Sequence, residues 1–279
     1  MEEITIITYN ILSSNLAELM LKESPDIYKY DFMNDDYRWN LISTYLTNQI
    51  NNNNNLVICL QEVSEDWLVK LATLFSKLNY KYVNIQYGRV FDGNMGVLIA
   101  YPNYLTISKS DMFTPGKYIK ITDDITSKAA GKMNTSIMLM LENPSLKIKF
   151  GVVTYHMPCE PNFLQISLMH SKILYKKIIK FMEDTKWIFT GDFNILPDTI
   201  TYKYLQTNCN CIWKDYLTYY PITNYSHIKG NTFKGCLDYI FYSKNNMTCK
   251  KVVFNGIDNV IPNSSESSDH ISIKAIFNI

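Results

Sequence analysis

Several apolar segments of the sequence end in a side chain that could bind a metal ion or a phosphate group. Asn10 follows residues 6–9, Glu62 follows residues 56–60, His156 follows residues 152–155, Asp192 and Asn194 follow residues 187–190, and Asp269 and His270 precede residues 271–273. Strands of one sheet can bring such ends together at one edge, where binding sites are commonly built. The sequence therefore predicts a polar site that is assembled from distant parts of the chain.

The donor atoms of this set suit a hard divalent cation. Glu62, Asp192 and Asp269 offer carboxylate oxygens, and Asn10 and Asn194 offer neutral amide groups. Oxygen donors without a cysteine favour Mg²⁺ or Mn²⁺ over Zn²⁺. Carboxylates that converge without a cation repel one another, whereas a bound divalent ion removes this repulsion and polarises a phosphoryl oxygen. Hydrolysis of a phosphate ester is the chemistry that this combination favours.

Each of these residues also has an ordinary structural interpretation when it is taken alone. Asn10 could cap a turn, Glu62 could interact with the dipole of a following helix, and His156 could be a hydrogen-bonded residue of the core. The stretch Gly-Asp-Phe-Asn at residues 191–194 is more distinctive, and it lies within an ordered set. The functional interpretation depends on that whole set.

Apolar periodicity predicts the elements that must position this site. Apolar runs predict strands at residues 4–9, 56–60, 96–101, 137–141, 148–154, 187–190, 237–242, 249–254 and 271–277. Apolar residues on one helical face predict helices at residues 38–50, 66–78 and 163–181. Strands outnumber helices and many have short connections, which favours an α/β (α+β) fold of stacked, mostly antiparallel sheets flanked by helices. No linker suggests a boundary, so residues 1–279 are expected to form one domain.

The composition excludes several classes of protein. Hydrophobic residues make up 47% and charged residues 19% of the 279 positions, so global disorder is excluded. The 27 Lys and Arg against 26 Asp and Glu give a net charge of +1, which excludes a histone-like polycation but not a nucleic-acid enzyme. No apolar run approaches the ~20 residues that span a bilayer, and no secretory signal is recognisable. We expect a cytoplasmic protein that does not bind membranes and whose cysteines are reduced.

Short motifs in the chain resemble, in their order, the endonuclease/exonuclease/phosphatase superfamily of metal-dependent phosphoesterases. The matching stretches are residues 8–10, 60–63, 155–156, 191–194, 237–240 and 268–270, and they span nearly the whole chain. The resemblance implies a four-layer α/β sandwich with two central mixed, mostly antiparallel sheets flanked by helices. It also implies that residues 1–279 form a single catalytic domain with its site at one end.

A narrower resemblance points to the branch that holds poly(A) deadenylases, nocturnin, Angel-type proteins and the 2′,5′-oligoadenylate phosphodiesterase. It is carried by residues 9–12, 38–39, 221–225 and 232–243. In that branch a Phe five residues before the Asp and a Pro five residues after the first His flank the adenine, and Phe233 and Pro161 occupy these positions here. The sequence departs from the family pattern in two respects, which bear on the choice of substrate more than on the catalytic chemistry. Cys159 stands where the family's His-Leu-x-Trp-x-Pro motif has Trp, and the sequence shows no leucine-rich repeats.

The resemblance implies a role for each site residue. Glu62 would be the principal Mg²⁺ ligand, Asn10 and Asp269 would complete or support its shell, and Asp192 would position or deprotonate the attacking water and contact a second metal. His156 and Asn194 would donate hydrogen bonds to the phosphoryl group, and His270, paired with Asp238, would bind the scissile phosphate. The expected catalytic residues are therefore His156, Asp192, Asn194, Asp238 and His270; the expected metal ligands are Glu62, Asn10, Asp269 and Asp192; and the expected substrate contacts are Phe233, Pro161 and Asn194.

These expectations predict a Mg²⁺-dependent phosphodiesterase, with Mn²⁺ able to substitute, that hydrolyses adenylate-containing RNA as a 3′ exoribonuclease of the deadenylase kind. A 2′-phosphatase acting on NADP(H) and a 2′,5′-oligoadenylate phosphodiesterase are alternatives within the same chemistry. A catalytically inactive module that binds RNA or a protein is an alternative of another class, although the complete set of acidic and imidazole residues argues against it. We expect a monomer whose partner is RNA or another adenine-containing nucleotide.

Overall fold

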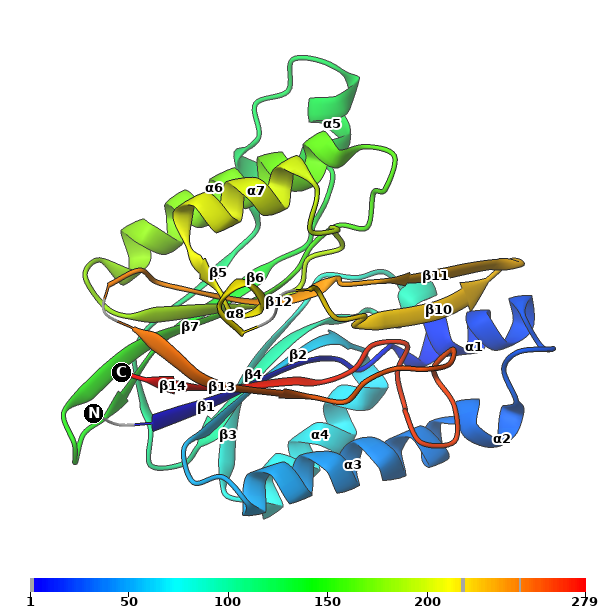
Figure 1. Cartoon of the computed structure of the whole chain (residues 1–279), viewed down its shortest axis with the longest axis horizontal. Coiled ribbons are helices and arrows are strands. Elements are labelled where there is room, and N and C mark those ends of the chain that lie inside the picture. Colours follow the sequence, from blue (N-terminus) through cyan, green and yellow to red (C-terminus); the bar gives the residue numbers. More distant parts are fainter. Residues whose placement is uncertain (1–2, 217–218, 246) are drawn as a thin grey trace.

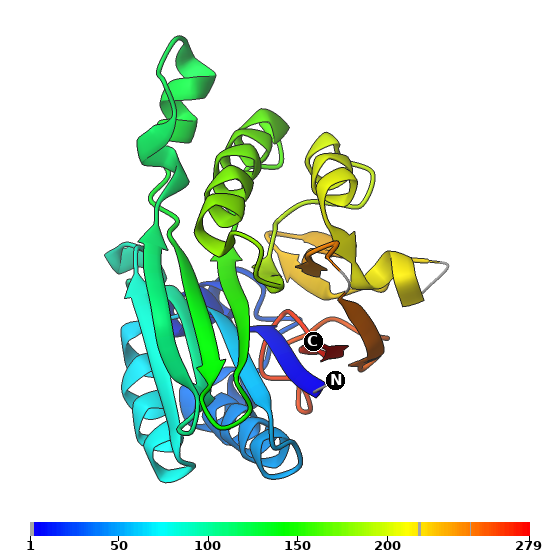
Figure 2. The ribbon, with the colours of Figure 1, turned by 90° about the vertical axis from the view of Figure 1, so that its left-hand side faces the viewer.

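Two six-stranded sheets pack against each other in the computed structural model, and helices cover their outer faces (Figure 1). The structure describes residues 3–216, 219–245 and 247–279. Helices α6 and α7 lie on one side of the sheets and α3 and α4 on the other, also in the turned view (Figure 2). The predicted four-layer α/β sandwich is therefore confirmed.

The first sheet contains both ends of the described chain. Its strand order is β13 (Thr248–Phe254), β14 (Ile273–Asn278), β1 (Glu3–Asn10), β2 (Leu56–Val63), β4 (Gly96–Pro102) and β3 (Tyr80–Gln86). Strands β1 and β2 are parallel, and the other neighbours are antiparallel. Because β14 runs antiparallel to β1, its first residues lie beside the last residues of β1, at the end of the sandwich away from the two termini (Figure 1).

The second sheet has the same mixed character. Its strand order is β5 (Thr106–Phe113), β6 (Ser136–Asn143), β7 (Ile148–His156), β8 (Trp187–Asp192), β12 (Asp238–Tyr242) and β9 (Asn210–Cys211). Only β7 and β8 form a parallel pair among these described strands. A separate hairpin of β10 (Asn224–Ile228) and β11 (Asn231–Gly235) lies beside helix α1 (Figure 1).

Polar caps begin several of the helices. The α-helices are α1 (Ser14–Glu23), α2 (Tyr30–Met33), α3 (Asp35–Asn51), α4 (Glu65–Lys77), α5 (Asp124–Ala130), α6 (Leu164–Met182), α7 (Ile200–Asn208) and α8 (Ile212–Tyr216), and the 3₁₀ turns are η1 (Val90–Asp92) and η2 (Pro115–Tyr118). A side-chain oxygen accepts a backbone N–H at the first turn of four helices: that of Ser13 at α1, Asn34 at α3, Ser64 at α4 and Thr199 at α7. Such a cap satisfies an N–H group that has no partner within the helix.

Apolar residues bury both faces of the central strands. In β1, Ile4 and Ile6 pack in the core between the two sheets, whereas Ile7 and Tyr9 pack against the layer that contains α3 and α4. A strand that is buried on both faces has a continuous apolar sequence instead of an alternating one. This explains why the predicted strands at residues 4–9, 56–60 and 187–190 have almost no charged positions.

The predicted strands and helices agree with the structure, but several further elements were not predicted. They are the helices α1, α2, α5, α7 and α8, the strands β3, β5 and β9, the β10–β11 hairpin and both 3₁₀ turns. The edge strands β3 and β5 are partly exposed and include Lys81, Lys109 and Asp111, so they lack the apolar run that marks the central strands. Among the described residues, every helix is too short or too polar to span a lipid bilayer.

Candidate active site

Three neighbouring strands of the second sheet place His156, Asp192 and Asp238 side by side. His156 ends β7 and is in register with Asp192, which ends the parallel strand β8. Asp192 is in register with Asp238, the first residue of the antiparallel strand β12. Gly191 allows this close pairing, because a Cβ atom there would lie 1.8 Å from the carbonyl oxygen of Tyr155.

A bulge in the first sheet turns Glu62 into the same region. The pairing of β2 with β4 shifts register between Gln61 and Val63, and the intervening Glu62 has a left-handed φ of 55°. A β-bulge re-aims one side chain, and such a backbone conformation costs about 1–3 kcal/mol for a residue other than glycine. The fold therefore retains local strain that presents a carboxylate at the edge of the sheet.

Asn10 joins the two sheets at the site. Its Nδ2 atom donates to Oε1 of Glu62 at 2.9 Å and to Oδ2 of Asp192 at 3.1 Å. The backbone N–H of Ser13, at the start of α1, donates to Oε2 of Glu62 at 3.2 Å. The positive end of the α1 dipole thus faces the Glu62 carboxylate and stabilises its charge.

Asp192 lies at the centre of the polar cluster. Its Oδ2 atom is 3.5 Å from Nε2 of His156 and also 3.5 Å from Nε2 of His270. Its Oδ1 atom accepts the backbone N–H of Asn194 at 2.9 Å, and the Nδ2 atom of Asn194 is 3.2 Å from Nε2 of His156. Both imidazoles and both amides therefore converge on one carboxylate.

His270 is held by a carboxylate on the far side of its ring. Its Nδ1 atom donates to Oδ2 of Asp238 at 2.7 Å, which leaves Nε2 directed toward Asp192. Burial by itself would lower the pKa of His270, but the carboxylates of Asp238, Asp192 and Asp269 outweigh it and raise the pKa well above the ordinary value. His270 is therefore an imidazolium at neutral pH.

The crowding of buried carboxylates favours the neutral, protonated form of two acidic residues. Burial, together with repulsion from Asp238, raises the pKa of Asp192, although His270 and His156 oppose this shift. Burial and the nearby charges of Glu62 and Asp192 raise the pKa of Asp269 to about 6. A cation bound among these carboxylates would relieve this electrostatic cost.

The donor set of the cluster fits a divalent metal ion. Potential ligand atoms of Glu62, His156 and Asp192 all lie within 4.8 Å of one another, as do those of Asp192, Asp238 and His270. Asp269 adds a buried Oδ1 atom that no donor reaches among the described residues. Carboxylate oxygens of this kind are what Mg²⁺ and Mn²⁺ prefer.

A cavity of about 580 Å³ opens beside the charged cluster. Glu62, Asp192 and His270 lie on its wall, as do both predicted base-contacting residues, Phe233 and Pro161. Phe233 lies on β11 and is 39% exposed, so it is not a core residue. The structure thus brings the predicted substrate contacts to the same cavity as three predicted metal ligands, Glu62, Asp192 and Asp269. The fourth, Asn10, does not line the cavity, and its Oδ1 accepts the backbone N–H of Leu12 at 3.0 Å.

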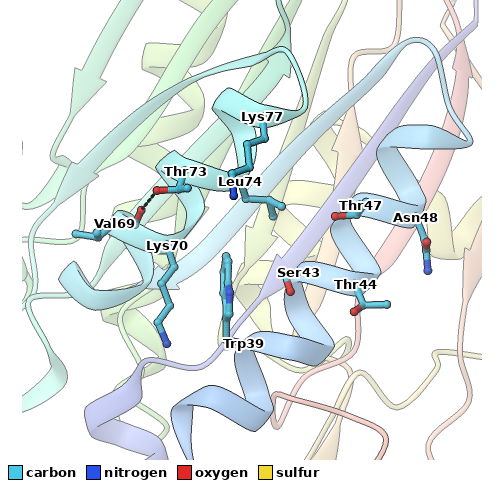
Figure 3. Close-up of a pocket in the computed structure, with 10 residues that line it drawn as sticks. All are labelled: Trp39, Ser43, Thr44, Thr47, Asn48, Val69, Lys70, Thr73, Leu74 and Lys77. Atoms are coloured by element: carbon cyan, nitrogen blue, oxygen red, sulfur yellow. Dashed lines mark hydrogen bonds between the residues drawn. The ribbon is translucent and has the colours of Figure 1, made fainter.

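A second concavity of about 540 Å³ lies between α3 and α4 (Figure 3). Trp39, Ser43 and Thr44 line it from one helix, and Lys70 and Leu74 line it from the other (Figure 3). Its lining contains no carboxylate and no imidazole, so it lacks the groups for metal binding or proton transfer. The chemistry of the described residues is concentrated in the cavity beside Asp192.

Three further residues support the site and were given no role from the sequence. Asn224 donates to Oδ2 of Asp269 at 3.1 Å. Ser268 donates to the backbone oxygen of Asn10 and accepts the backbone N–H of His270. Asn224 and Ser268 both lie within stretches that resemble the family. Ser268 also directly precedes Asp269, and these positions are the signal that could have given both residues a role.

Arg38 is the third of these residues, and its side chain is fully buried. Its guanidinium donates to the backbone oxygens of Ile11 and Leu12, which follow Asn10, and of Ser267, which precedes Asp269. One buried cation therefore ties together the two chain segments that carry the ends of the site. An Arg at position 4 of a helix is usually a surface residue, so its burial does not follow from the local pattern. The resemblance carried by residues 38–39 is the signal that singles Arg38 out.

Comparison with known proteins gives consistent matches. The model of the Endonuclease/Exonuclease/phosphatase family matches residues 7–270. A probable CCR4-Not complex 3′-5′-exoribonuclease subunit Ccr4 of Enterocytozoon bieneusi (strain H348) is 27% identical over 189 residues, which cover 58% of this chain and 39% of that protein. The CCR4-Not complex 3′-5′-exoribonuclease subunit Ccr4 of Mycosarcoma maydis is 23% identical over 218 residues, which cover 57% of this chain and 32% of that protein. The matched region is thus well under half of either relative.

Solved structures share the fold over almost the whole chain. ANGEL2, described as a 2′,3′-cyclic phosphatase and bound to adenosine-2′,3′-vanadate, has a TM-score of 0.79 at 17% identity, with 99% of this chain and 95% of that chain covered. The catalytic domain of human Nocturnin, with a bound sulfate anion, has a TM-score of 0.71 at 21% identity, with 99% and 93% covered. At this identity the likeness shows the fold.

Proposed function

The chain belongs to the Endonuclease/Exonuclease/phosphatase family, and from this we propose that it is a Mg²⁺-dependent phosphodiesterase that shortens adenylate-containing RNA from the 3′ end. The observation that carries this proposal is the convergence of Asn10, His156 and His270 on the Asp192 carboxylate, beside Glu62. The matches to two Ccr4 exoribonuclease subunits support RNA as the substrate.

Phosphoryl transfer depends mainly on positioning and on stabilising charge, and these side chains suit both tasks. Glu62, Asp192 and Asp269 would hold the cation, which supplies Lewis-acid activation of a phosphoryl oxygen when bound. Asp192 orients the attacking water and accepts its proton. His270, kept protonated by Asp238, places a positive charge at the phosphate where negative charge develops in the transition state. No covalent nucleophile is needed for this reaction.

His156 and Asn194 complete the phosphate site in this proposal. The Asn194 amide nitrogen lies close to both Nε2 of His156 and the backbone oxygen of Met157, which fixes its orientation. Asn194 also has a left-handed φ of 48°, which lets the residue turn back toward Asp192. Pre-organised donors of this kind cost no reorganisation when the reaction proceeds.

A panel of phosphate esters tests the proposal. The purified protein is incubated with A-rich 3′,5′-linked RNA, 2′,5′-linked oligoadenylate, NADP⁺ and abasic DNA, each with Mg²⁺ and with EDTA. We expect stepwise release of mononucleotides from the 3′ end of the RNA with Mg²⁺ and none with EDTA. Hydrolysis of NADP⁺ or of the 2′,5′ linkage in preference to the RNA would replace the proposed substrate, and no metal-dependent hydrolysis at all would overturn the proposal.

A histidine pair supplies the matched control. His270→Ala should remove the activity, whereas His227→Ala changes a histidine on strand β10 that does not line the cavity. Equal loss in both variants would mean that the proteins are misfolded, and circular dichroism distinguishes that case. Full activity of His270→Ala with normal folding would contradict the assigned role.

A further inference from the structure

A further cavity of about 550 Å³, which we call the side cavity, meets the catalytic cavity at three residues. Met95, His156 and Cys159 line both of them. The rest of the side cavity is lined by the loop before β4, by the end of α5 and the segment that follows it, and by the residues that follow β7. Its volume is within the range of about 300–1,000 Å³ that is usual for ligand sites. A ligand bound at His156 could therefore extend into both cavities.

The two cavities differ in charge. Three carboxylates line the catalytic cavity, and no lysine or arginine is among the described residues of its wall. The side cavity is lined by Arg89, Lys128 and Lys132, together with the acidic residues Asp92 and Glu160. All the lysine and arginine side chains that line either cavity within the described residues therefore belong to the side cavity. A strand of phosphates that passes the catalytic cluster meets its positive charge on that side.

Arg89 is the basic residue of the side cavity that is best placed to receive an anion. Both acidic residues of the wall have partners within the protein: Oδ1 of Asp92 accepts the backbone N–H of Arg89 at 2.8 Å and that of Met95 at 3.3 Å, and Glu160 forms an ion pair with Lys132. The Arg89 side chain is exposed, and no ion pair between described residues includes it. A guanidinium can donate two parallel hydrogen bonds to one phosphate.

The loop that carries Arg89 also presents an exposed aromatic ring. Phe91 lines the side cavity, yet 67% of its surface is exposed. The loop is held in place, because Nδ2 of Asn15 in α1 donates to the backbone oxygen of Val90 at 3.1 Å and the two N–H bonds to Asp92 close the turn. A nucleic-acid base can stack on such a ring whatever its identity, since every base has a flat face.

We propose that the side cavity holds the nucleotide that precedes the scissile phosphate, with its base against Phe91 and its 5′-phosphate at Arg89. The proposal rests on the proposed function, in which the 3′-terminal nucleotide occupies the catalytic cavity. A phosphodiester joins two nucleosides, so a strand that is cut beside His156 has one nucleoside on each side of the reacting phosphate. The catalytic cavity receives the nucleotide that is released, and the side cavity receives the strand that remains.

Two dinucleotides that differ by one phosphate test the role of Arg89. ApA contains only the scissile phosphate, and pApA adds the 5′-phosphate assigned to the side cavity. In the wild type with Mg²⁺ we expect KM for pApA to be about three- to tenfold lower than for ApA, with a similar kcat. Arg89→Met should abolish this difference, whereas Lys149→Met, which removes an exposed charge on β7 outside both cavities, should keep it. No difference in the wild type, or the same difference in Arg89→Met, would overturn the assignment of Arg89.

A trimer that lacks one base tests the role of Phe91. ApApA is compared with the same trimer in which the middle ribose carries no base. In the wild type the missing base should raise KM by about fivefold or more, which is the lower end of the effect of one stacked base. Phe91→Ser should bind the two trimers about equally well. Val90→Ser is the control, since Val90 is 80% exposed in the same turn but does not line the side cavity. An undiminished effect of the missing base in Phe91→Ser would overturn the stacking role.

The outcome for the side cavity can be separated from the outcome for the proposed function. If the protein hydrolyses none of these oligonucleotides, their dissociation constants, measured by calorimetry on the same variants, take the place of KM. Losses of affinity confined to Arg89→Met and Phe91→Ser would then keep the side-cavity assignment and overturn the proposed function. Metal-dependent hydrolysis of RNA with wild-type KM in both variants would do the reverse.

Discussion

Nδ1 of His270 donates a hydrogen bond of 2.7 Å to Oδ2 of Asp238, and this contact fixes both the direction and the charge of the imidazole. Nε2 then faces the Asp192 carboxylate at 3.5 Å. Since both partners are buried, the interaction is little screened by solvent. We therefore expect changes in this pair to lower the catalytic rate more than they weaken substrate binding.

The first prediction concerns this pair. Asp238→Asn should lower kcat about 10²–10⁴-fold, because the His270 ring loses the partner that keeps it protonated and oriented. The pKa of His270 is raised in the wild type, so its imidazolium persists to high pH, and the variant should lose activity at a lower pH on the alkaline side. A pH–rate profile measures both effects. Asp111→Asn, on the edge strand β5, is the control, and an unchanged alkaline limb in Asp238→Asn would contradict the prediction.

The second prediction concerns the metal site. Glu62→Gln keeps the size of the side chain but removes one negative charge, so we expect the Mg²⁺ concentration for half-maximal activity to rise and the rate to fall about 10²–10⁴-fold. Glu65→Gln changes an exposed residue of the first turn of α4 and should leave both quantities unchanged. Measuring the rate as a function of Mg²⁺ concentration checks this prediction. A fall in rate of less than about threefold in Glu62→Gln would contradict the role of Glu62 as a metal ligand.

The third prediction concerns the stability of the metal-free protein as a function of pH. The pKa of Asp269 is about 6 in the folded protein against an ordinary value of 3.8, so the native state binds more protons than the unfolded state between these values. Stability should therefore fall as the pH rises from about 4 to 6, and the raised pKa of His270 extends the same trend above its ordinary value of 6.5.

Mg²⁺ should reverse this trend by neutralising the carboxylates. We expect a larger increase of Tm on adding Mg²⁺ at pH 7.5 than at pH 5, where protons compete for the same oxygens. Differential scanning fluorimetry at the two pH values, with Ca²⁺-free buffer and with EDTA as the reference, measures this. Equal shifts at both pH values would show that the ion binds elsewhere.

The fourth prediction concerns Arg38. Arg38→Met should cost about 2–4 kcal/mol of unfolding free energy, because three buried carbonyl oxygens lose their donor. Arg89→Met changes an exposed arginine and should cost less than about 0.5 kcal/mol. Urea denaturation of both variants in EDTA makes the comparison. Equal stability of the two variants would show that the carbonyl contacts contribute little.

The fifth prediction concerns Gly191. Its φ of 151° and the distance of 1.8 Å from an added Cβ atom to the Tyr155 oxygen mean that Gly191→Ala must separate β7 from β8. We expect a loss of about 3 kcal/mol or more, with a matching loss of activity as His156 moves away from Asp192. Gly256→Ala, where an added Cβ atom meets nothing within 4 Å, should be close to neutral. Thermal melts followed by circular dichroism report the difference.

Much of the fold could be predicted from the sequence because the central strands are buried on both faces. Residues 4–9 and 56–60 carry no charge and are apolar except for Thr5 and Thr8, so their strand character does not depend on the rest of the fold. The edge strand β5 is mostly exposed, and its pattern of Thr106, Lys109 and Asp111 is compatible with a loop. Its strand structure comes from pairing with β6, which is a tertiary interaction that no local pattern records.

The candidate site could be assembled from residue types at the ends of strands, but its surroundings could not. The register that aligns His156 with Asp192 follows from parallel pairing, which the sequence does not specify. The burial of Arg38 and the apolar wall contributed by α1 also depend on packing between distant segments. Leu12, Leu16, Leu19 and Met20 have helical spacing, and this periodicity is the signal that could have predicted α1.

Asn10 and His270 lie near opposite ends of the described chain, yet adjacent strands of one sheet bring them to the same place. A piece of the chain that ends before residue 270 therefore cannot hold the complete set of charged groups. Such a truncated form lacks both the final imidazole of the site and strand β14, the partner of β1 and β13.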